Sequence, residues 1–183
     1  MNFSELVGQT RTIHSFIPNE GPSKQELESC LELCLLAPNH KMTFPWKIIR
    51  ASGELRQKIA DVTADYKARS GGNEQECEVS RQRSLSAKEL VIFVHKKNPE
   101  DTFREREDYA TLCCSIQLLA LSLRDLGYGY KWSTGKVSRA PEVSGLLGVK
   151  DLEEVIGFVW VGKEGKALGV AKRPLLKEVL EEI

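Results

Sequence analysis

The stretch APNHKMTFPW, residues 37–46, joins a predicted helix to a predicted strand and carries more chemistry than a simple turn requires. A connecting turn is usually built from Gly, Asn or Asp, with few large side chains. This stretch instead contains an Asn-His-Lys triplet, a methionine, a phenylalanine and a Pro-Trp pair. Pro38 limits the preceding helix, and Trp46 opens the apolar run WKIIRA. We therefore interpret the stretch as one wall of a binding site.

The elements expected on either side of this stretch alternate between helix and strand. SKQE at 23–26 forms a capping box, in which Ser23 and Glu26 satisfy each other's backbone amides at the start of a helix. Polar, glycine-bearing residues predict a mobile loop near 70–80. The pattern as a whole, with a short C-terminal arm, predicts a mixed α+β domain. Further helices are expected at 3–8, 53–69, 103–126 and 140–148, and strands at 46–51, 89–96, 127–132 and 154–163.

Size and charge restrict the classes of protein that this sequence can form. With 183 residues, of which 41% are hydrophobic and 28% charged, the chain fits one globular domain spanning 1–183. Lys and Arg together number 26, as do Asp and Glu, so the formal net charge is zero. Nucleic acids and anionic membranes attract clustered positive charge. We therefore expect neither nucleic acid nor membrane as a main partner.

The cysteines and the apolar stretches predict a cytoplasmic protein. The five cysteines form no CxxC motif, and Cys30 and Cys34 share one apolar helical face. This pattern favours reduced thiols over a disulfide framework or a zinc site. The N-terminal residues lack the apolar core of a signal peptide. The longest apolar stretch, LCCSIQLLALSL at 112–123, is too short to span a bilayer.

Three segments, in order, resemble the nitroreductase family of FMN-dependent oxidoreductases. TRTIHSF at 10–16 is similar to the family signature R-R-S-x-R-x-F, and APNHKMTFPWKI at 37–48 is similar to A-P-S-x-x-N-x-Q-P-W. LGYGYKWSTG at 126–135 follows a long apolar helix and precedes VIGFVWVGK and KRPLLKEV. The short family members, which carry APDHK in the second segment, are the most similar. The resemblance implies a nitroreductase-like α+β fold, with a central, mostly antiparallel sheet flanked by helices, in an intertwined homodimer.

The resemblance assigns the N-terminal segment to the phosphate and the pyrimidine edge of FMN. A phosphate needs positive charge and hydroxyl donors, which Arg11 and Thr12 can supply. If the segment is extended, Thr10, Thr12 and His14 share one face. His14 would then approach the pyrimidine edge, where a cation stabilises the reduced ring. The alternative for this segment is a solvent-exposed basic turn with no role in binding.

The N-terminal segment carries less positive charge than the family signature, and the C-terminal segment contains basic residues that could compensate. The first Arg of the family signature is Thr10 in this chain. Lys172 and Arg173 stand where larger relatives carry phosphate-binding basic residues, so the resemblance makes them the candidates to replace it. An exposed Lys-Arg pair near a terminus can equally be a solvated tail.

The resemblance places the other two segments beside the flavin ring. Asn39, His40 and Met42 would approach the flavin held mainly by the partner subunit, although His40 could instead be a satisfied loop histidine. Met42 and Phe44 fill the family's amide positions, so two possible hydrogen bonds become apolar contacts. In the third segment a backbone amide would reach flavin N5. The residues expected beside the ring there are Trp132, Ser133 and Thr134. For Trp132, ordinary packing in the core is the alternative.

These inferences predict an FMN-dependent oxidoreductase with shared sites in a homodimer. NADH or NADPH would give a hydride to FMN and leave, and an electron-poor small molecule such as a nitroaromatic or a quinone would take the same place. One alternative is a flavin-binding regulatory or storage module with little turnover, in which Met42 and Phe44 narrow the cavity. Another is a cysteine-dependent enzyme using Cys113 or Cys114, whose apolar helix predicts raised thiol pKa values and poor reactivity. The sequence contains no GxGxxG or Walker motif.

Overall fold

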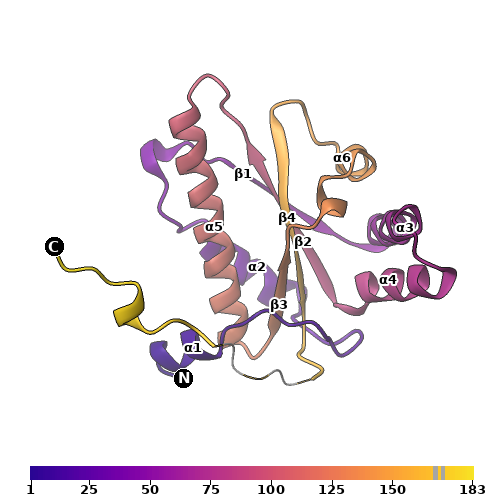
Figure 1. Cartoon of the computed structure of the whole chain (residues 1–183), viewed down its shortest axis with the longest axis horizontal. Coiled ribbons are helices and arrows are strands. Elements are labelled where there is room, and N and C mark those ends of the chain that lie inside the picture. The colour runs from indigo at the N-terminus through magenta and orange to yellow at the C-terminus, as the bar shows by residue number, and fades with distance from the viewer. Residues whose placement is uncertain (167–168, 170–171) are drawn as a thin grey trace.

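A four-stranded antiparallel sheet forms the centre of the protein, with helices on both of its faces (Figure 1). The structure, a computed structural model, describes residues 1–166, 169 and 172–183. The strands lie in the order β1-β2-β4-β3, which confirms the predicted α+β class. They are β1 (Trp46–Ala51), β2 (Glu89–Lys96), β3 (Gly129–Ser133) and β4 (Glu153–Gly162). The α-helices of the described residues are α1 (Phe3–Gln9), α2 (Lys24–Cys34), α3 (Gly53–Arg69), α4 (Glu74–Ser86), α5 (Thr102–Asp125) and α6 (Pro141–Leu147).

The two faces of the sheet bury separate apolar cores. Helices α2 and α5 pack on one face, where Leu27 and Leu119 lie against Val91 of β2. Helices α3 and α6 pack on the other face, where Ile59 and Val143 join residues of β2 and β4. Each fully buried side chain of this size contributes about 1.5–3 kcal/mol relative to an exposed one. The two cores therefore fix the sheet and, with it, the positions of the segments that carry the predicted site.

The long helix α5 forms the spine of one core, as its sequence predicts. It contains 24 residues, which corresponds to about 36 Å at about 1.5 Å per residue. Leu112, Ile116, Leu119 and Leu123 are buried along the face that meets the sheet. Because the helix is this long, its two ends can support two separate groups of predicted site residues.

The predicted mobile loop near 70–80 is wrong, because residues 74–86 form helix α4. Asn73 caps this helix: its side-chain oxygen accepts a hydrogen bond from the Glu76 amide at 2.9 Å. The Glu76 carboxylate accepts one from the Asn73 amide at 3.1 Å, which completes a capping box. At the other end, the Arg56 guanidinium of α3 donates to the carbonyl of Lys88 at 2.6 Å and also to that of Ala87. The helix is therefore held at both ends by polar contacts.

The two terminal segments lie on the β3 side of the sheet. Thr12 forms a parallel bridge with Tyr130 of β3, and Phe16 forms an antiparallel bridge with Glu164. The described residues after 171 extend away from the body of the protein and include a short 3₁₀ turn, Leu176–Glu178 (Figure 1). Among the helices that the structure describes, none combines the length and apolar character that a membrane crossing needs.

Candidate cofactor site

A first cavity, the Arg173 cavity, lies between the N-terminal segment, the middle of α5 and β3. Its volume is about 470 Å³. It gathers predicted residues from both ends of the chain, together with Gln117 and Tyr130, which sequence reasoning did not single out. The predicted residues that line it are Thr10, Arg11, Thr12 and Arg173.

Two of these predicted residues already have partners within the chain. Arg11 Nη2 lies 3.1 Å from Glu164 Oε1, and Arg124 Nη1 lies 3.3 Å from the other oxygen of the same carboxylate. The Thr10 hydroxyl donates to the Leu6 carbonyl at 2.7 Å, so its proton is not available to a ligand. Glu164 therefore offsets part of the positive charge that Arg11 brings to the cavity, and Thr10 contributes shape more than a donor.

Arg173 and Thr12 are two donors of this cavity that have no partner among the described residues. Arg173 is exposed and forms no ion pair with any residue in the described ranges. The Thr12 hydroxyl likewise has no hydrogen-bond partner among those residues. A phosphate fits this donor set, because it accepts hydrogen bonds from a guanidinium and from hydroxyl groups. Lys172 is exposed and is not among the residues that line the cavity.

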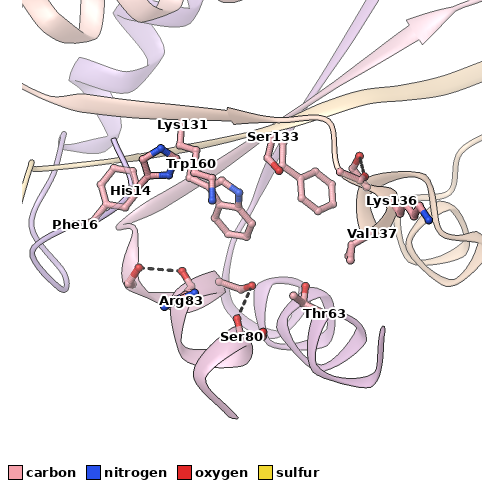
Figure 2. A pocket seen from close by; sticks show the side chains of 15 residues that line it. His14, Phe16, Thr63, Ser80, Arg83, Lys131, Ser133, Lys136, Val137 and Trp160 are labelled. Atoms are coloured by element: carbon pink, nitrogen blue, oxygen red, sulfur yellow. Dashed lines mark hydrogen bonds between the residues drawn. The ribbon is translucent and has the colours of Figure 1, made fainter. Parts of the chain in front are cut away.

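A second cavity, the Arg83 cavity, lies between the sheet and helices α3 and α4 (Figure 2). Its volume is about 240 Å³. Aromatic side chains from the N-terminal segment and the sheet form one wall, and hydroxyl groups from α3 and α4 face them. The aromatic residues are Phe16, Phe158 and Trp160, and the basic residues are Arg83, Lys131 and Lys136. No carboxylate lines the cavity within the part of the chain that the structure describes.

The positive charge of the Arg83 cavity is uncompensated. Burial lowers the pKa of Lys131, and the nearby positive charge of Arg83 lowers the same pKa further. Neither side chain forms an ion pair or a hydrogen bond with another described residue, and the same holds for Lys136. Like charges held together without an acid are electrostatically unfavourable. An electron-rich or anionic group in this cavity would relieve the repulsion.

The structure separates His14 from the hydroxyl groups with which it was expected to share a face. Thr12 lines the Arg173 cavity, whereas His14 lines the Arg83 cavity. Between them Ile13 is buried, and its amide donates to the Tyr130 carbonyl at 2.8 Å. The chain bends at His14 rather than continuing as a strand. The shared-face expectation is therefore wrong, and the segment bridges two cavities.

The third predicted segment borders both cavities. Ser133 lines the Arg83 cavity, and Thr134 follows the last residue of β3 that pairs with β4. Trp132 packs against the α2–α5 core, as the core alternative expects. Its indole lies so close to Gly157 that a Cβ there would stand 2.3 Å from Nε1. This Nε1 is buried and has no hydrogen-bond partner among the described residues.

The stretch at 37–46 is docked on the N-terminal half of α5. The Thr111 hydroxyl donates to the Pro38 carbonyl at 2.8 Å. His40 Nδ1 lies 2.8 Å from the Glu107 carboxylate. This contact is what the alternative for His40, a loop histidine with a hydrogen-bond partner in its own chain, would show. The Asn39 side chain is turned toward its own loop, where its oxygen accepts the Phe44 amide at 2.9 Å. His40 Nε2 remains the ring nitrogen available to a ligand.

This loop has a strained backbone and an exposed apolar surface. Lys41, Met42 and Phe44 have φ values of 56°, 52° and 50°. Such conformations cost non-glycine residues about 1–2 kcal/mol each. Met42 is 64% exposed and Phe44 is 51% exposed. Strained residues persist where surrounding contacts impose them, and they cluster at functional sites.

The two groups of predicted residues lie at opposite ends of α5. His40 contacts Glu107 near the start of the helix, whereas Arg11 shares Glu164 with Arg124 near its end. These helix positions are separated by about 25 Å along the axis, at about 1.5 Å per residue. Within one chain, therefore, the 37–46 stretch does not complete the cavities formed by the N-terminal segment.

The thiols and possible metal ligands offer no competing site among the described residues. Burial raises the pKa of Cys34 to about 12 and also raises the pKa of Cys113. The direction for Cys113 agrees with the raised thiol pKa expected from its apolar helix, whereas its neighbour Cys114 is exposed. Among the residues that the structure describes, no group of three or more His, Cys, Asp and Glu side chains is arranged to hold a metal ion.

Comparison with known proteins gives a consistent result. The family model described as "Nitroreductase family" matches residues 7–163. YdjA of Escherichia coli (strain K12), which bears the provisional name NAD(P)H nitroreductase, is 22% identical over 162 residues, covering 88% of each chain. A nitroreductase-like family protein from Bacillus cereus superposes with a TM-score of 0.87 at 23% identity, over 100% of this chain and 96% of that one. The NADPH:FMN oxidoreductase from Vibrio harveyi, complexed with NAD⁺, gives a TM-score of 0.79 at 18% identity, over 98% and 76% of the two chains. This chain therefore belongs to the nitroreductase family.

Proposed function

We propose that this protein is an FMN-dependent oxidoreductase that accepts electrons from NADH or NADPH and passes them to an electron-poor small molecule. The observation that carries the proposal is the pair of cavities joined by residues 10–16. One offers the free donors Arg173 and Thr12, and the other combines an aromatic wall with the unpaired cations Arg83 and Lys131. A phosphate suits the first set of side chains, and a planar, electron-rich ring suits the second.

The donors of the Arg173 cavity suit the phosphate of FMN, and the aromatic and basic residues of the Arg83 cavity suit its ring. The two cavities lie on opposite faces of β3, so a single flavin would have to extend around this edge of the sheet to use both. Arg173 and Thr12 would hold the phosphate, with Arg11 assisting from its contact with Glu164. His14, Arg83 and Lys131 would lie at the pyrimidine edge, where the reduced ring gains negative charge and a nearby cation stabilises it. Ser133 and Thr134 would lie beside the ring, and the backbone after the last pair of β3 would approach N5. The unpaired charge in the Arg83 cavity supports this placement.

When bound, FMN supplies hydride transfer from NAD(P)H and then to an acceptor such as a nitroaromatic or a quinone, in a ping-pong sequence. The protein contributes binding, orientation and charge, and no side chain is required as a nucleophile or as a general acid. The names of the related proteins support this chemistry: one is an NADPH:FMN oxidoreductase and another bears the provisional name NAD(P)H nitroreductase.

A homodimer would complete each site. Because no residue of the 37–46 stretch lines either cavity of its own chain, a partner in the antiparallel orientation would be needed to bring a second copy of the stretch to them. Asn39, His40 and Met42 would then face the flavin held by the other subunit. The C-terminal arm supports dimer formation, since several apolar side chains on it have no cover in one chain. The exposed fractions are 58% for Leu175, 70% for Leu176, 65% for Val179 and 53% for Leu180.

The absorbance spectrum of the purified protein tests the cofactor directly. Peaks in the blue and near-ultraviolet, released as FMN on denaturation, are expected. Anaerobic mixing with NADH or NADPH should then bleach these peaks rapidly, whereas a storage module would bleach slowly or not at all. A colourless protein that cannot be reconstituted with FMN would overturn the proposal.

A further inference from the structure

We propose that Asp108 is a positioning residue, which acts through Thr43 and Asn39 to hold the 37–46 stretch in the shape that a flavin site requires. The role at the site rests on the proposed function, whereas the hydrogen-bonded chain itself does not. Asp108 lies on α5, is only 3% exposed and forms no ion pair with the described residues. A buried carboxyl group without a cation is costly unless it is hydrogen-bonded. Its partner is the hydroxyl of Thr43.

The hydrogen bonds run in one direction from the loop to the helix. The Phe44 amide donates to Asn39 Oδ1 at 2.9 Å, which fixes the Asn39 oxygen on that side. Asn39 Nδ2 therefore faces Thr43 and donates to its hydroxyl oxygen at 2.8 Å. Since that oxygen receives the amide, the Thr43 hydroxyl proton is directed to Asp108. Each hydrogen bond in this chain therefore has a defined donor and a defined acceptor.

This chain of hydrogen bonds begins in the part of the loop that has the strained backbone. Phe44, with a φ of 50°, donates the first hydrogen bond, and Met42, with a φ of 52°, lies inside the turn that Asn39 closes. Without the inward contacts these residues would relax toward ordinary backbone conformations. The Met42 and Phe44 side chains, and the ring of His40, point outward and are more than half exposed. The buried Asp108 thereby sets the direction of side chains that it does not touch.

Threonine 43 offers the sharpest variants, because its size can be kept while its hydroxyl is removed. Thr43→Val removes the link, and Thr43→Ser retains it. Thr102→Val is a matched control. Thr102 is an exposed threonine on α5, the helix that carries Asp108, and its hydroxyl has no partner among the described residues. Asp108→Asn keeps an acceptor oxygen, and the Thr43→Val/Asp108→Asn double variant tests whether the two positions act as a unit.

Hydrogen exchange of the Phe44 amide in the flavin-free protein measures the chain independently of function. Thr43→Val should speed this exchange about tenfold to a hundredfold, the effect of losing a hydrogen bond to a charged group, whereas Thr43→Ser and Thr102→Val should not. In the FMN-loaded protein, Thr43→Val should weaken FMN binding or slow its reduction by NAD(P)H, and the double variant should be no worse than the more affected single one. Unchanged Phe44 exchange in Thr43→Val would overturn the chain, whatever the protein binds. Faster exchange with unchanged FMN affinity and reduction rate would overturn the positioning role. A protein that binds no FMN would overturn the proposed function while leaving the exchange result intact.

Discussion

A mixed dimer tests whether the two ends of α5 serve different flavins. One subunit carries Arg173→Ala, which removes the free cation of the Arg173 cavity, and the other subunit carries His40→Ala. Both side chains are exposed, and Arg173 forms no ion pair with the described residues, so neither change should unfold the protein. If each flavin takes Arg173 from one chain and His40 from the other, the mixed dimer contains one intact site and one site with both lesions.

The size of the effect follows from the contacts. Loss of a charge-assisted hydrogen bond to phosphate costs about 1.5–3 kcal/mol, or roughly tenfold to a hundredfold in FMN affinity. At an FMN concentration near the wild-type Kd, the intact sites are about half filled, whereas sites weakened by this amount are about one-tenth filled or less. The shared-site arrangement therefore predicts close to half of the wild-type flavin content. Sites built within one chain would each carry one lesion, and both would be depleted.

The assay uses two affinity tags, so that only mixed dimers are purified, followed by a titration of FMN fluorescence quenching. Each single variant as a pure dimer sets the damaged baseline, and a mixed-tag wild-type dimer sets the full signal. A titration with one class of weakened sites would refute the shared arrangement, and so would a stable monomer with full FMN occupancy.

Four other changes test the electrostatics. Arg11→Ala should weaken FMN binding toward the lower end of the tenfold to hundredfold range, because Glu164 already offsets the charge of Arg11. Glu164→Gln should strengthen FMN binding. Equal FMN affinities in the wild type and both variants would place the phosphate elsewhere. Arg83→Gln should lower the midpoint potential of bound FMN by about 30 mV or more, corresponding to about 1.4 kcal/mol for a two-electron couple, and an unchanged potential in a redox titration would remove Arg83 from the ring. Burial lowers the pKa of His95 from 6.5, so in the window below 6.5 the unfolded chain binds more protons and the unfolding free energy falls as pH falls, by up to about 1.4 kcal/mol per unit. His95→Gln should flatten this decline in urea titrations, and an identical slope would contradict it.

The predictable part of the fold was written in strong local patterns. Helix α5 has an apolar face that continues for several turns, and its buried leucines lie at helical spacing. The strand at 89–96 contains an unbroken apolar run at 90–94, which is typical of a strand covered on both faces. The capping box at Ser23 and Glu26 marked the start of α2 correctly. In each case a short segment carries enough information by itself.

Helix α4 was missed because its apolar residues form no helical face. It offers only the cap at Asn73 and Glu76 as a local signal, and the preceding glycines outweighed that signal. The helix is stabilised instead by contacts distant in sequence, such as the Arg56 guanidinium on the carbonyls at its end. The error extended to the site, since Arg83 belongs to α4 and its importance depends on the approach of Lys131 from β3. No pattern within either segment indicates that the two cations meet.

The alternative of a flavin-storing module now depends on one part of the structure. Met42 and Phe44 were the reason to consider a narrowed cavity, yet neither lines the Arg173 or the Arg83 cavity of its own chain. Both side chains face outward from the 37–46 stretch, at 64% and 51% exposure. In the proposed dimer, any narrowing of the site would come from the partner's stretch, and its extent would depend on how firmly Asp108 and Thr43 hold that stretch. Loosening this hold in a storage module should speed flavin reduction, because it opens the cavity, whereas in an enzyme it should slow reduction, because it disorders the wall. The sign of the change in Thr43→Val thus separates the two functions.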